Sequence, residues 1–445
     1  MDVASTIFAL SSGPGRAGVA VVRVSGAGAA QAIERLAGRL PEPRHAAFRR
    51  LRDAAGEVID EALVLWFPGP RSETGEDMAE FQVHGSRAVL AKLFRTLGAL
   101  AGFRPAEPGE FARRAFGNGK MDLTAVEGLA DLINAETDVQ RRQALKQAGG
   151  ALARIYDAWR AGLIEAMALV EAALDFSDEG DVSDTAARQA HTKVAGLADE
   201  LQSHLSGAHR GEIVREGYHV VLAGPPNVGK SSLLNALARR DVAIVSDEPG
   251  TTRDVLEVRL DLGGLPVIVS DTAGLRDDAG AVEREGMRRT FERASGADLV
   301  LWIVDPLDPT WDPPVDLAGD GVAMLRLLNK CDLAGLATVT TGRAVMQVSA
   351  RTGAGLAELT ASIAERARDA VGDIASVAVP TTVRHRLLVS EALGHLTRFC
   401  QGEQSALELQ AEDLRLAAHA LGRLTGRIDA EDVLGSVFGQ FCIGK

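Results

Sequence analysis

Cysteine is scarce in this sequence, and the few cysteines lie far apart. Three occur in 445 residues, at Cys331, Cys400 and Cys442. An odd number at such separations argues against a disulfide framework, and also against a zinc site, which needs several ligands at close spacing. The cysteine content therefore predicts a reduced, cytoplasmic protein.

Long apolar runs and a targeting segment are also missing. No apolar run reaches the ~18 residues that a membrane-spanning helix needs. The opening stretch "MDVASTIFALSS" has no basic region ahead of its short apolar part, as a signal peptide would have. We therefore expect no contact with a membrane. Aromatic residues make up only 4% of the chain.

The chain lacks the excess of basic residues that is typical of proteins that coat nucleic acids. Its net charge is −13, but residues 1–120 hold 16 Lys and Arg against 13 Asp and Glu, which gives +3 there and −16 elsewhere. The imbalance argues against bulk binding of nucleic acid. Either it is ordinary variation of a solvated surface, or it predicts that an anionic ligand other than a nucleotide binds within residues 1–120.

The first 120 residues have the pattern of a mixed α/β domain. The runs "TIFAL" and "GVAVVRV" are rich in β-branched residues and are separated by the turn-forming "SSGPGRAG". Further strands are predicted for "EALVLWF" and "MAEFQVHG", and a helix for "AVLAKLFRTLGAL".

The rest of the chain predicts an α/β domain inserted into a helical domain. Residues 121–212 and 373–445 have helical periodicity, with an acidic loop expected at "DFSDEGDVSD", whereas residues 213–372 alternate strands and helices. The apolar stripes that define the two helical segments are Ile155, Trp159, Leu163, Met167, Val170 and Leu174, and Leu407, Leu414, Ala417, Leu421 and Leu424. The expected fold class is thus α/β and α.

A phosphate-binding loop follows the first strand of the inserted domain. In "YHVVLAGPPNVGKSSLLNAL", Gly224, Gly229, Lys230 and Ser231 fit the pattern Gly, four residues, Gly-Lys-Ser. The glycines let backbone N–H groups face phosphate oxygens, and the following helix adds its positive end. We predict that Lys230 reaches the β- and γ-phosphates and that the Ser231 hydroxyl binds Mg²⁺.

Three more strand ends complete a guanine-nucleotide site. "IVSDTAG" would place Asp271 near Mg²⁺, through water, and the Gly274 N–H near the γ-phosphate. "LRLLNKCD" brings Asn329, Lys330 and Asp332, and a carboxylate there accepts two donors that guanine has and adenine lacks. "MQVSA" would close the Ser349–Ala350 loop over the base. The sequence therefore predicts GTP as the ligand, rather than ATP.

A switch segment is expected at "DEPGTTRD", where Thr251 and Thr252 are equal candidates for completing the Mg²⁺ shell. The glutamine that orients water in Ras-like enzymes is absent, since Leu275 follows the Asp-x-x-Gly motif. Arg253 and Arg276 lie nearby, but a solvated surface position explains each of them better than an arginine-finger role does. Another group must therefore supply charge and position the water.

With these motifs in hand, the chain closely resembles the MnmE (also TrmE) family of bacterial tRNA-modification GTPases over essentially its whole length. The likeness is carried by "GPGRAGVAVVRVSG", "TGEDMAEFQVHG" and "PGEFARRAFGNGKMDLTAVEGLADLI" in the first domain, by "PNVGKSSLLNAL", "GTTRD" and "DTAGLR" in the GTPase domain, and by the terminal "CIGK". Pro225 and Ser86 are small departures, and neither is an expected ligand.

The resemblance implies a potassium-stimulated GTPase that forms a homodimer through its N-terminal domain. It would work with a flavin-dependent, MnmG-like protein and place an aminomethyl or carboxymethylaminomethyl group on C5 of the wobble uridine of tRNA. The carbon would come from a formyl- or methylene-tetrahydrofolate. A ribosome-assembly GTPase is the main alternative. Two further alternatives are a binding module, in which GTP closes a clamp and hydrolysis only resets it, and a folate enzyme with a regulatory GTPase domain.

The resemblance also implies ligand sets. Thr252 would join Ser231 on Mg²⁺, Asn227 and the backbone at Ser246, Glu248 and Thr251 would hold K⁺, and Glu283 would help to position the water. Folate would contact Arg23, Glu80, Lys120 and Lys445. Motifs and resemblance together give these GTP-binding residues: Asn227, Val228, Gly229, Lys230, Ser231, Ser232, Ser246, Asp247, Glu248, Pro249, Gly250, Thr251, Thr252, Asp271, Thr272, Ala273, Gly274, Asn329, Lys330, Cys331, Asp332, Ser349 and Ala350.

The terminal "FCIGK" puts Cys442 where a prenylated cysteine would stand. Gly444 and Lys445 do not fit that motif, so we do not expect a lipid anchor. The resemblance implies instead that the tail reaches from the helical domain to a folate site of the N-terminal domain. Cys442 would then either attack the substrate base as a nucleophile or pack beside the site.

Overall fold

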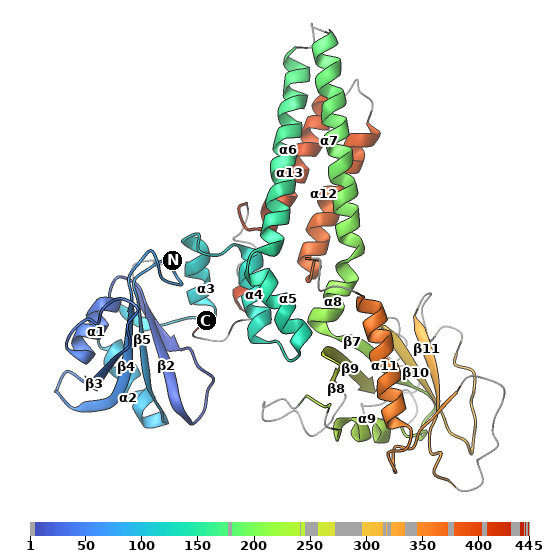
Figure 1. Cartoon of the computed structure of the whole chain (residues 1–445), viewed down its shortest axis with the longest axis horizontal. Coiled ribbons are helices and arrows are strands. Elements are labelled where there is room, and N and C mark those ends of the chain that lie inside the picture. Colours follow the sequence, from blue (N-terminus) through green and yellow to red (C-terminus); the bar gives the residue numbers. More distant parts are fainter. Residues whose placement is uncertain are drawn as a thin grey trace, which may run out of the picture. The chain divides into compact units, whose positions relative to one another are not determined.

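The computed structural model describes residues 5–176, 180–240, 242–244, 257–271, 296–314, 317, 322–333, 345–372, 378–402, 407–428, 437–439, 441 and 444. The chain forms two compact units. One comprises Met1–Ala130, Gln147–Glu165 and Arg415–Lys445, and the other comprises Asp131–Lys146 and Ala166–Leu414 (Figure 1). No helix within the described ranges is both long enough and apolar enough to span a membrane.

The N-terminal part of the first unit is a six-stranded mixed sheet in the order β3-β4-β5-β2-β1-β6. The strands are β1 (Thr6–Leu10), β2 (Ala17–Ser25), β3 (Ala47–Arg52), β4 (Val58–Phe67), β5 (Met78–Gly85) and β6 (Phe103–Pro105), and the helices are α1 (Ala29–Ala37), α2 (Arg87–Gly98) and α3 (Glu110–Gly117). The strands predicted at "TIFAL", "GVAVVRV", "EALVLWF" and "MAEFQVHG" are confirmed, as is the helix before residue 100.

Alternation along these strands creates two faces with different partners. Phe8, Val22 and Phe81 point to the face that α1 and α2 cover, where they form the main core of this domain. Their neighbours Ile7 and Met78 point to the opposite face and pack against Phe111 of α3. A polar residue that stands next to a main-core residue in its strand therefore points to the face on which α3 lies.

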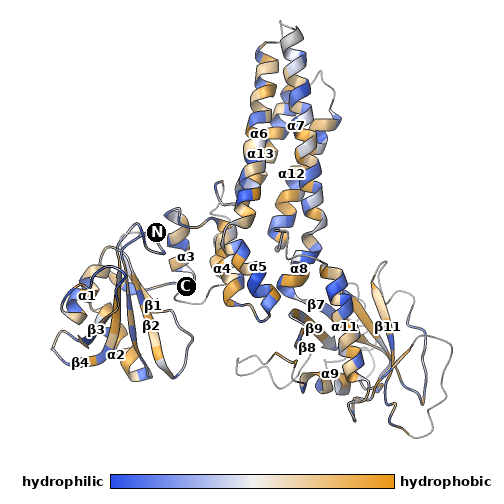
Figure 2. Cartoon of the chain, in the orientation of Figure 1, coloured by the Kyte–Doolittle hydropathy of each residue, from blue (hydrophilic) through white to orange (hydrophobic). Residues whose placement is uncertain are grey.

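The second unit contains a six-stranded sheet in the order β12-β11-β10-β7-β9-β8, in which only β8 is antiparallel to its neighbour. The strands are β7 (Tyr218–Ala223), β8 (Glu257–Leu262), β9 (Leu265–Asp271), β10 (Leu299–Val304), β11 (Ala323–Leu328) and β12 (Met346–Gln347), with helices α9 (Lys230–Ala238) and α11 (Leu356–Val371). Central strands such as β10 are buried throughout and hydrophobic in Figure 2. Parallel strands with their carboxyl ends on one edge create the edge at which open α/β sheets bind their ligands.

Helices make up the rest of the described chain: α4 (Leu123–Ile133), α5 (Asp138–Ala148), α6 (Ala151–Asp175), α7 (Gly180–Ser206), α8 (Ala208–Glu216), α12 (Val383–Gln401) and α13 (Leu407–Leu424). α7 and α12 pack side by side, and the rings of His191 and Phe399 lie 4.8 Å apart between them (Figure 1). The predicted stripes are helical, and Leu163 and Leu421 are among their buried members.

The predicted acidic loop over residues 175–184 is wrong in its second half, because α7 begins at Gly180. Two features of the sequence explain the early start. The Ser183 hydroxyl donates to the Ala173 carbonyl of α6 at 2.8 Å, which ties the two helices together. Acidic residues such as Asp184 near the start of a helix are stabilised by its positive end.

Candidate functional site

The phosphate-binding loop joins β7 to α9, and its two motif glycines are required by its shape. Gly224 has φ +149° and Gly229 has φ +97°. A Cβ atom on Gly224 would lie 2.6 Å from the Ile303 carbonyl oxygen, and one on Gly229 would lie 2.4 Å from the Asn329 side chain. The loop can therefore adopt this conformation only with glycine at both positions.

Lys230 is buried at the start of α9. Its Nζ atom donates to the carbonyl oxygens of Gly224 at 2.8 Å and Pro225 at 3.0 Å. Burial lowers the pKa of this ammonium, although the Asp271 carboxylate opposes the shift. The positive charge is thereby held inside the loop, where a phosphate chain would compensate it.

Ser231, a predicted Mg²⁺ ligand, contacts Asp271, which was predicted to act on the metal through water. The Ser231 hydroxyl donates to Asp271 Oδ2 at 2.6 Å, and Asp271, the last residue of β9, is buried. A hydroxyl is a hard oxygen ligand of the kind that Mg²⁺ selects, and a carboxylate beside it can hold a water molecule of the metal's shell. The residues present therefore fit Mg²⁺.

Asn329 and Lys330 support the phosphate loop from the end of β11. The Asn329 amide donates to the Val228 carbonyl at 2.8 Å and accepts from the Ala350 N–H at 3.3 Å. Lys330 donates to the Asn227 carbonyl at 3.0 Å and to Asp305 at 2.6 Å. Both side chains predicted for base recognition therefore also fix the loop that binds phosphates.

Asp332 presents an ionised carboxylate at the base-binding end. The Ser349 hydroxyl donates to Oδ1 at 2.6 Å, and an Arg351 nitrogen lies 2.8 Å from Oδ2. The Ser349 hydrogen bond holds the pKa of Asp332 below its usual value. An anionic acceptor of this kind suits the two donors on the Watson–Crick edge of guanine.

Two partners at this site were missed by sequence reasoning. Asp305 directly follows β10, and burial would raise its pKa, but the Lys330 hydrogen bond outweighs burial and lowers it. Its position at a strand end is the signal that would have found it. Arg351 directly follows the predicted Ser349–Ala350 loop, and no motif pointed to it.

Some predicted residues have other surroundings or lie outside the described ranges. Val228 is buried, Ser232 is exposed, and the Cys331 N–H donates to the Val348 carbonyl at 3.2 Å. The ranges that the structure describes exclude Ser246, Asp247, Glu248, Pro249, Gly250, Thr251, Thr252, Thr272, Ala273, Gly274, Glu283, Cys442 and Lys445.

The N-terminal sheet brings two of the predicted folate ligands together. Arg23 and Glu80 are cross-strand partners on β2 and β5, and Arg23 nitrogens donate to Glu80 Oε1 at 3.1 and 3.2 Å. Arg23 also pairs with Glu73 at 2.8 Å and lies over the Phe111 ring of α3. Lys120 donates instead to the Pro70 carbonyl at 3.0 Å, so it contacts the same 70–76 loop at another point.

A buried carboxylate beneath this cluster was not predicted. Glu110, at the start of α3, accepts from Arg104 at 2.6 Å and from Arg114 at 3.0 Å. Burial alone would raise the pKa of Glu110, but the Arg104 hydrogen bond, the Glu107 N–H and Arg114 outweigh it and lower the pKa to about 2. The charged network fixes α3 on the face of the sheet that also holds Arg23.

The C-terminal tail contacts this same domain. The Ser11 hydroxyl donates to the Gly444 carbonyl at 2.7 Å, and Gly444 has φ +105°. Leu10, which also contacts Gly444, is paired with Val22, one residue away from Arg23. Phe438 and Phe441 anchor the tail in an apolar cluster with residues of α3 and α4.

Comparison with known proteins gives consistent relatives along the whole chain. Residues 123–442 match the model described as MnmE helical domain, and residues 6–120 match the one described as GTP-binding protein TrmE N-terminus. A "tRNA modification GTPase MnmE" from Rhodopseudomonas palustris is 52% identical over 99% of both chains. Proteins of the same name from Paramagnetospirillum magneticum and Methylorubrum populi are 52% identical (100% of both chains) and 53% identical (99% of this chain, 98% of the relative).

Proposed function

Because the chain belongs to the MnmE family of tRNA modification GTPases, we propose that it installs an aminomethyl or carboxymethylaminomethyl group on C5 of the wobble uridine of tRNA. GTP hydrolysis is the activity of its inserted domain. The observation that carries the proposal is the tail, whose Gly444 accepts a hydrogen bond from Ser11 at the end of β1. This strand pairs with β2, which carries the Arg23 of the Arg23–Glu80 pair, on a domain separate from the nucleotide site. A chain that only hydrolysed GTP would need neither feature.

In the nucleotide site, Lys230 would neutralise charge on the β- and γ-phosphates. Ser231 and Thr252 would hold Mg²⁺, with Asp271 acting through water, and a bound Mg²⁺ supplies electrostatic stabilisation of the phosphoryl group. The 2.6 Å contact between Ser231 and Asp271 supports this assignment. Asp332 would select guanine.

We further propose that K⁺ provides the charge that an arginine finger would provide elsewhere. Asn227 and backbone atoms at Ser246, Glu248 and Thr251 would hold it beside the phosphates. The support is that Asn227 is an exposed residue of the loop, with φ +62° and its backbone carbonyl held by Lys330. Glu283 would help to position the attacking water.

The N-terminal cluster is proposed to bind a formyl- or methylene-tetrahydrofolate. Arg23, Lys120 and Lys445 suit the anionic glutamate part of folate, and Glu80 suits the hydrogen-bond donors of the pterin ring. Arg23 and Glu80 are each less than one-fifth exposed, so their charges are partly shielded from water. Cys442, which lies outside the described residues, is proposed either to attack the substrate base as a nucleophile or to pack beside this site, as the family resemblance implies.

The chain is proposed to act as a cytoplasmic homodimer formed through residues 1–120, together with a flavin-dependent, MnmG-like protein. A reconstituted reaction tests the whole proposal: purified protein, flavoprotein, tRNA, tetrahydrofolate donor and GTP, followed by mass spectrometry of the nucleosides. We expect C5-modified uridine, and we expect it to be lost with Glu80→Gln while GTP hydrolysis continues. Equal modification with a non-hydrolysable GTP analogue would favour the alternative of a clamp that GTP merely closes.

A further inference from the structure

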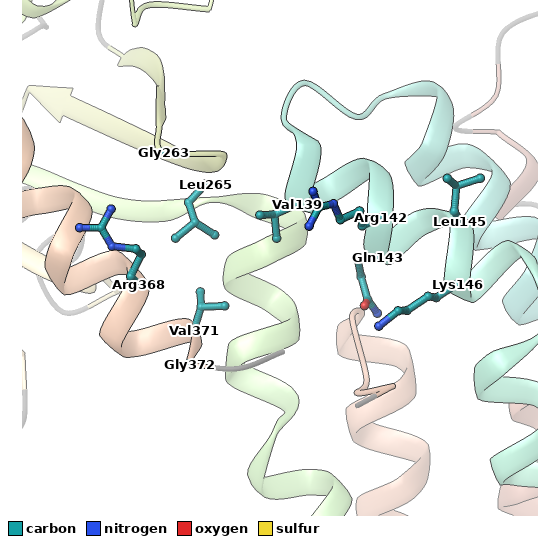
Figure 3. Close-up of a pocket in the computed structure, with 10 residues that line it drawn as sticks. All are labelled: Val139, Arg142, Gln143, Leu145, Lys146, Gly263, Leu265, Arg368, Val371 and Gly372. Atoms are coloured by element: carbon teal, nitrogen blue, oxygen red, sulfur yellow. The ribbon is translucent and has the colours of Figure 1, made fainter. Parts of the chain in front are cut away.

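One face of α5 borders a cavity of about 590 Å³ within the second unit (Figure 3). α5 contributes Val139, Arg142, Gln143 and Lys146, which recur at the spacing of one helical face. The opposite wall is made by the β8–β9 turn at Gly263 and Leu265 and by the end of α11. We call this space the α5 cavity. Its volume is in the range of ordinary ligand and anchor pockets.

The charges around the α5 cavity have one sign. Arg142, Lys146 and Arg368 line it, and no acidic residue is among its lining residues. On α5, Asp138 lies 2.6 Å from Arg141 and 2.7 Å from Arg142, so that one carboxylate faces two guanidinium groups. This local positive excess stands out in a chain whose net charge is −13. The cavity therefore suits an anionic partner.

The floor of the cavity is apolar, which favours a partner that also has an apolar group to bury. Leu265 and Val371 are buried side chains of the GTPase domain, and Val139 packs against the same core. Leu145 lines the cavity and is 46% exposed, although α5 is otherwise mainly hydrophilic in Figure 2. Phosphate groups of a nucleic acid need the cations but gain nothing from an apolar floor. An apolar side chain flanked by carboxylates would use both features.

The α5 cavity is built on elements that also contact β8, the strand that follows the 245–256 segment in the sequence. The Ile244 N–H donates to the Arg259 carbonyl at 2.8 Å, so that β8 joins the residues on both sides of the 245–256 segment. The Arg259 side chain lies 3.2 Å from Glu136, just before α5, and the Gln140 amide donates to the Arg215 carbonyl at 3.0 Å. A partner docked in the α5 cavity would contact α5 and the GTPase domain together.

We propose that the α5 cavity is the docking site for an acidic segment with an apolar anchor, carried by the flavin-dependent partner. The proposal rests on the proposed function, in which such a partner exists. The anchor fills the floor between Leu265 and Val371, and carboxylates on either side of it pair with Arg142 and Arg368. Leu145 extends the apolar contact at the rim.

The test is the dissociation constant of the full-length protein and the purified flavoprotein, measured by titration calorimetry at two salt concentrations. Arg368→Glu and Leu145→Glu should each raise Kd at least about tenfold, because like charges or a buried carboxylate then oppose the docked segment. Arg188→Glu is the matched charge-reversal control, at an exposed position of α7 outside the lining, and it should change Kd less than about twofold. GTP hydrolysis of each variant without the flavoprotein verifies folding and should equal that of the parent.

The possible results distinguish a failure of this docking site from a failure of the proposed tRNA-modification function. Parental Kd values for both Arg368→Glu and Leu145→Glu would overturn the α5 cavity as the docking site and leave the proposed function intact. A loss of tRNA affinity with unchanged flavoprotein affinity would also overturn it, since the surface would then serve RNA. A parent protein that does not bind the flavoprotein at all would refute both.

Discussion

The hydroxyl of Ser11 donates a hydrogen bond to the carbonyl oxygen of Gly444 at 2.7 Å, across 433 positions of sequence. The contact fixes the end of the chain at the end of β1, whose residue Ala9 pairs with Arg23 on β2. A Cβ atom on Gly444 would lie 2.0 Å from the Leu10 carbonyl oxygen. The tail can therefore approach β1 this closely only because residue 444 is glycine.

Gly444→Ala should accordingly displace the tail. We expect tRNA modification to fall by about a hundredfold, the loss that misplacement of a reacting group by roughly 1 Å produces. GTP hydrolysis should be unchanged, because the nucleotide site belongs to the other unit. Nucleoside mass spectrometry and phosphate release measure the two activities.

Two further variants complete this experiment. Deleting the last four residues should abolish modification while GTP hydrolysis and dimerisation remain, and Cys442→Ser tests the thiol separately. A truncated protein that modifies tRNA at the parental rate would show that the tail is dispensable.

Asp332→Asn should change the preferred base. The carboxylate accepts two donors from guanine, and a buried polar group left without a partner costs roughly 1–3 kcal/mol, or about 5- to 150-fold in affinity. GTP should bind that much more weakly, whereas xanthosine triphosphate, which has an acceptor in place of the guanine amine, should bind better than it does to the parent. Fluorescence titration with both nucleotides checks this, and an undiminished preference for GTP would refute the base assignment.

The side chain of Asn227 should be responsible for the dependence of GTP hydrolysis on K⁺. Hydrolysis by the parent should be much faster in K⁺ than in Na⁺ at equal ionic strength, and Asn227→Ala should remove the difference with little effect on nucleotide affinity. Since residue 227 has φ +62°, alanine also strains the loop. Asn227→Gly is the control that removes the amide without this strain, and it should show the same loss. Equal rates in both salts for the parent would exclude a K⁺ role.

The stability of the N-terminal domain should fall in acid because of Glu110. Its pKa is lowered from 4.5 to about 2 in the folded chain, a difference worth roughly 3 kcal/mol. A lowered pKa stabilises the fold fully above pH 4.5, and the contribution is lost as the pH falls from there towards 2. Hydrogen exchange of α3, normalised to intrinsic rates, should increase over that window in the parent. In Glu110→Gln, exchange should already be faster at pH 6 and should respond less to acid.

Much of the nucleotide site was predictable because its residues lie at or shortly after the carboxyl ends of parallel strands. Asp271 ends β9, whereas Lys230 and Asp332 lie in the segments that follow β7 and β11, and parallel strands bring these segments to one edge of the sheet. Local spacing was therefore enough to predict which residues meet. The insertion of this domain between helical segments followed from the change of hydrophobic period.

Partners that depend on tertiary packing were not predictable in the same way. Arg351 meets Asp332, and Glu110 meets Arg104 and Arg114, through side-chain positions that no local pattern encodes. Arg23 and Glu80 face each other because β2 pairs with β5 in this register. No local pattern in the sequence gives that register, so the two residues were expected as ligands only from the family resemblance. The early start of α7 was missed since polar, acidic residues occur both in loops and at helix N-termini.

The most direct test of the central claim is mass spectrometry of tRNA nucleosides from cells that lack this protein. The account predicts that wobble uridines lose their aminomethyl or carboxymethylaminomethyl group at C5, and that the parent gene restores it while a gene lacking the last four codons does not. Wobble uridines that stay fully modified in the deletion strain would contradict it.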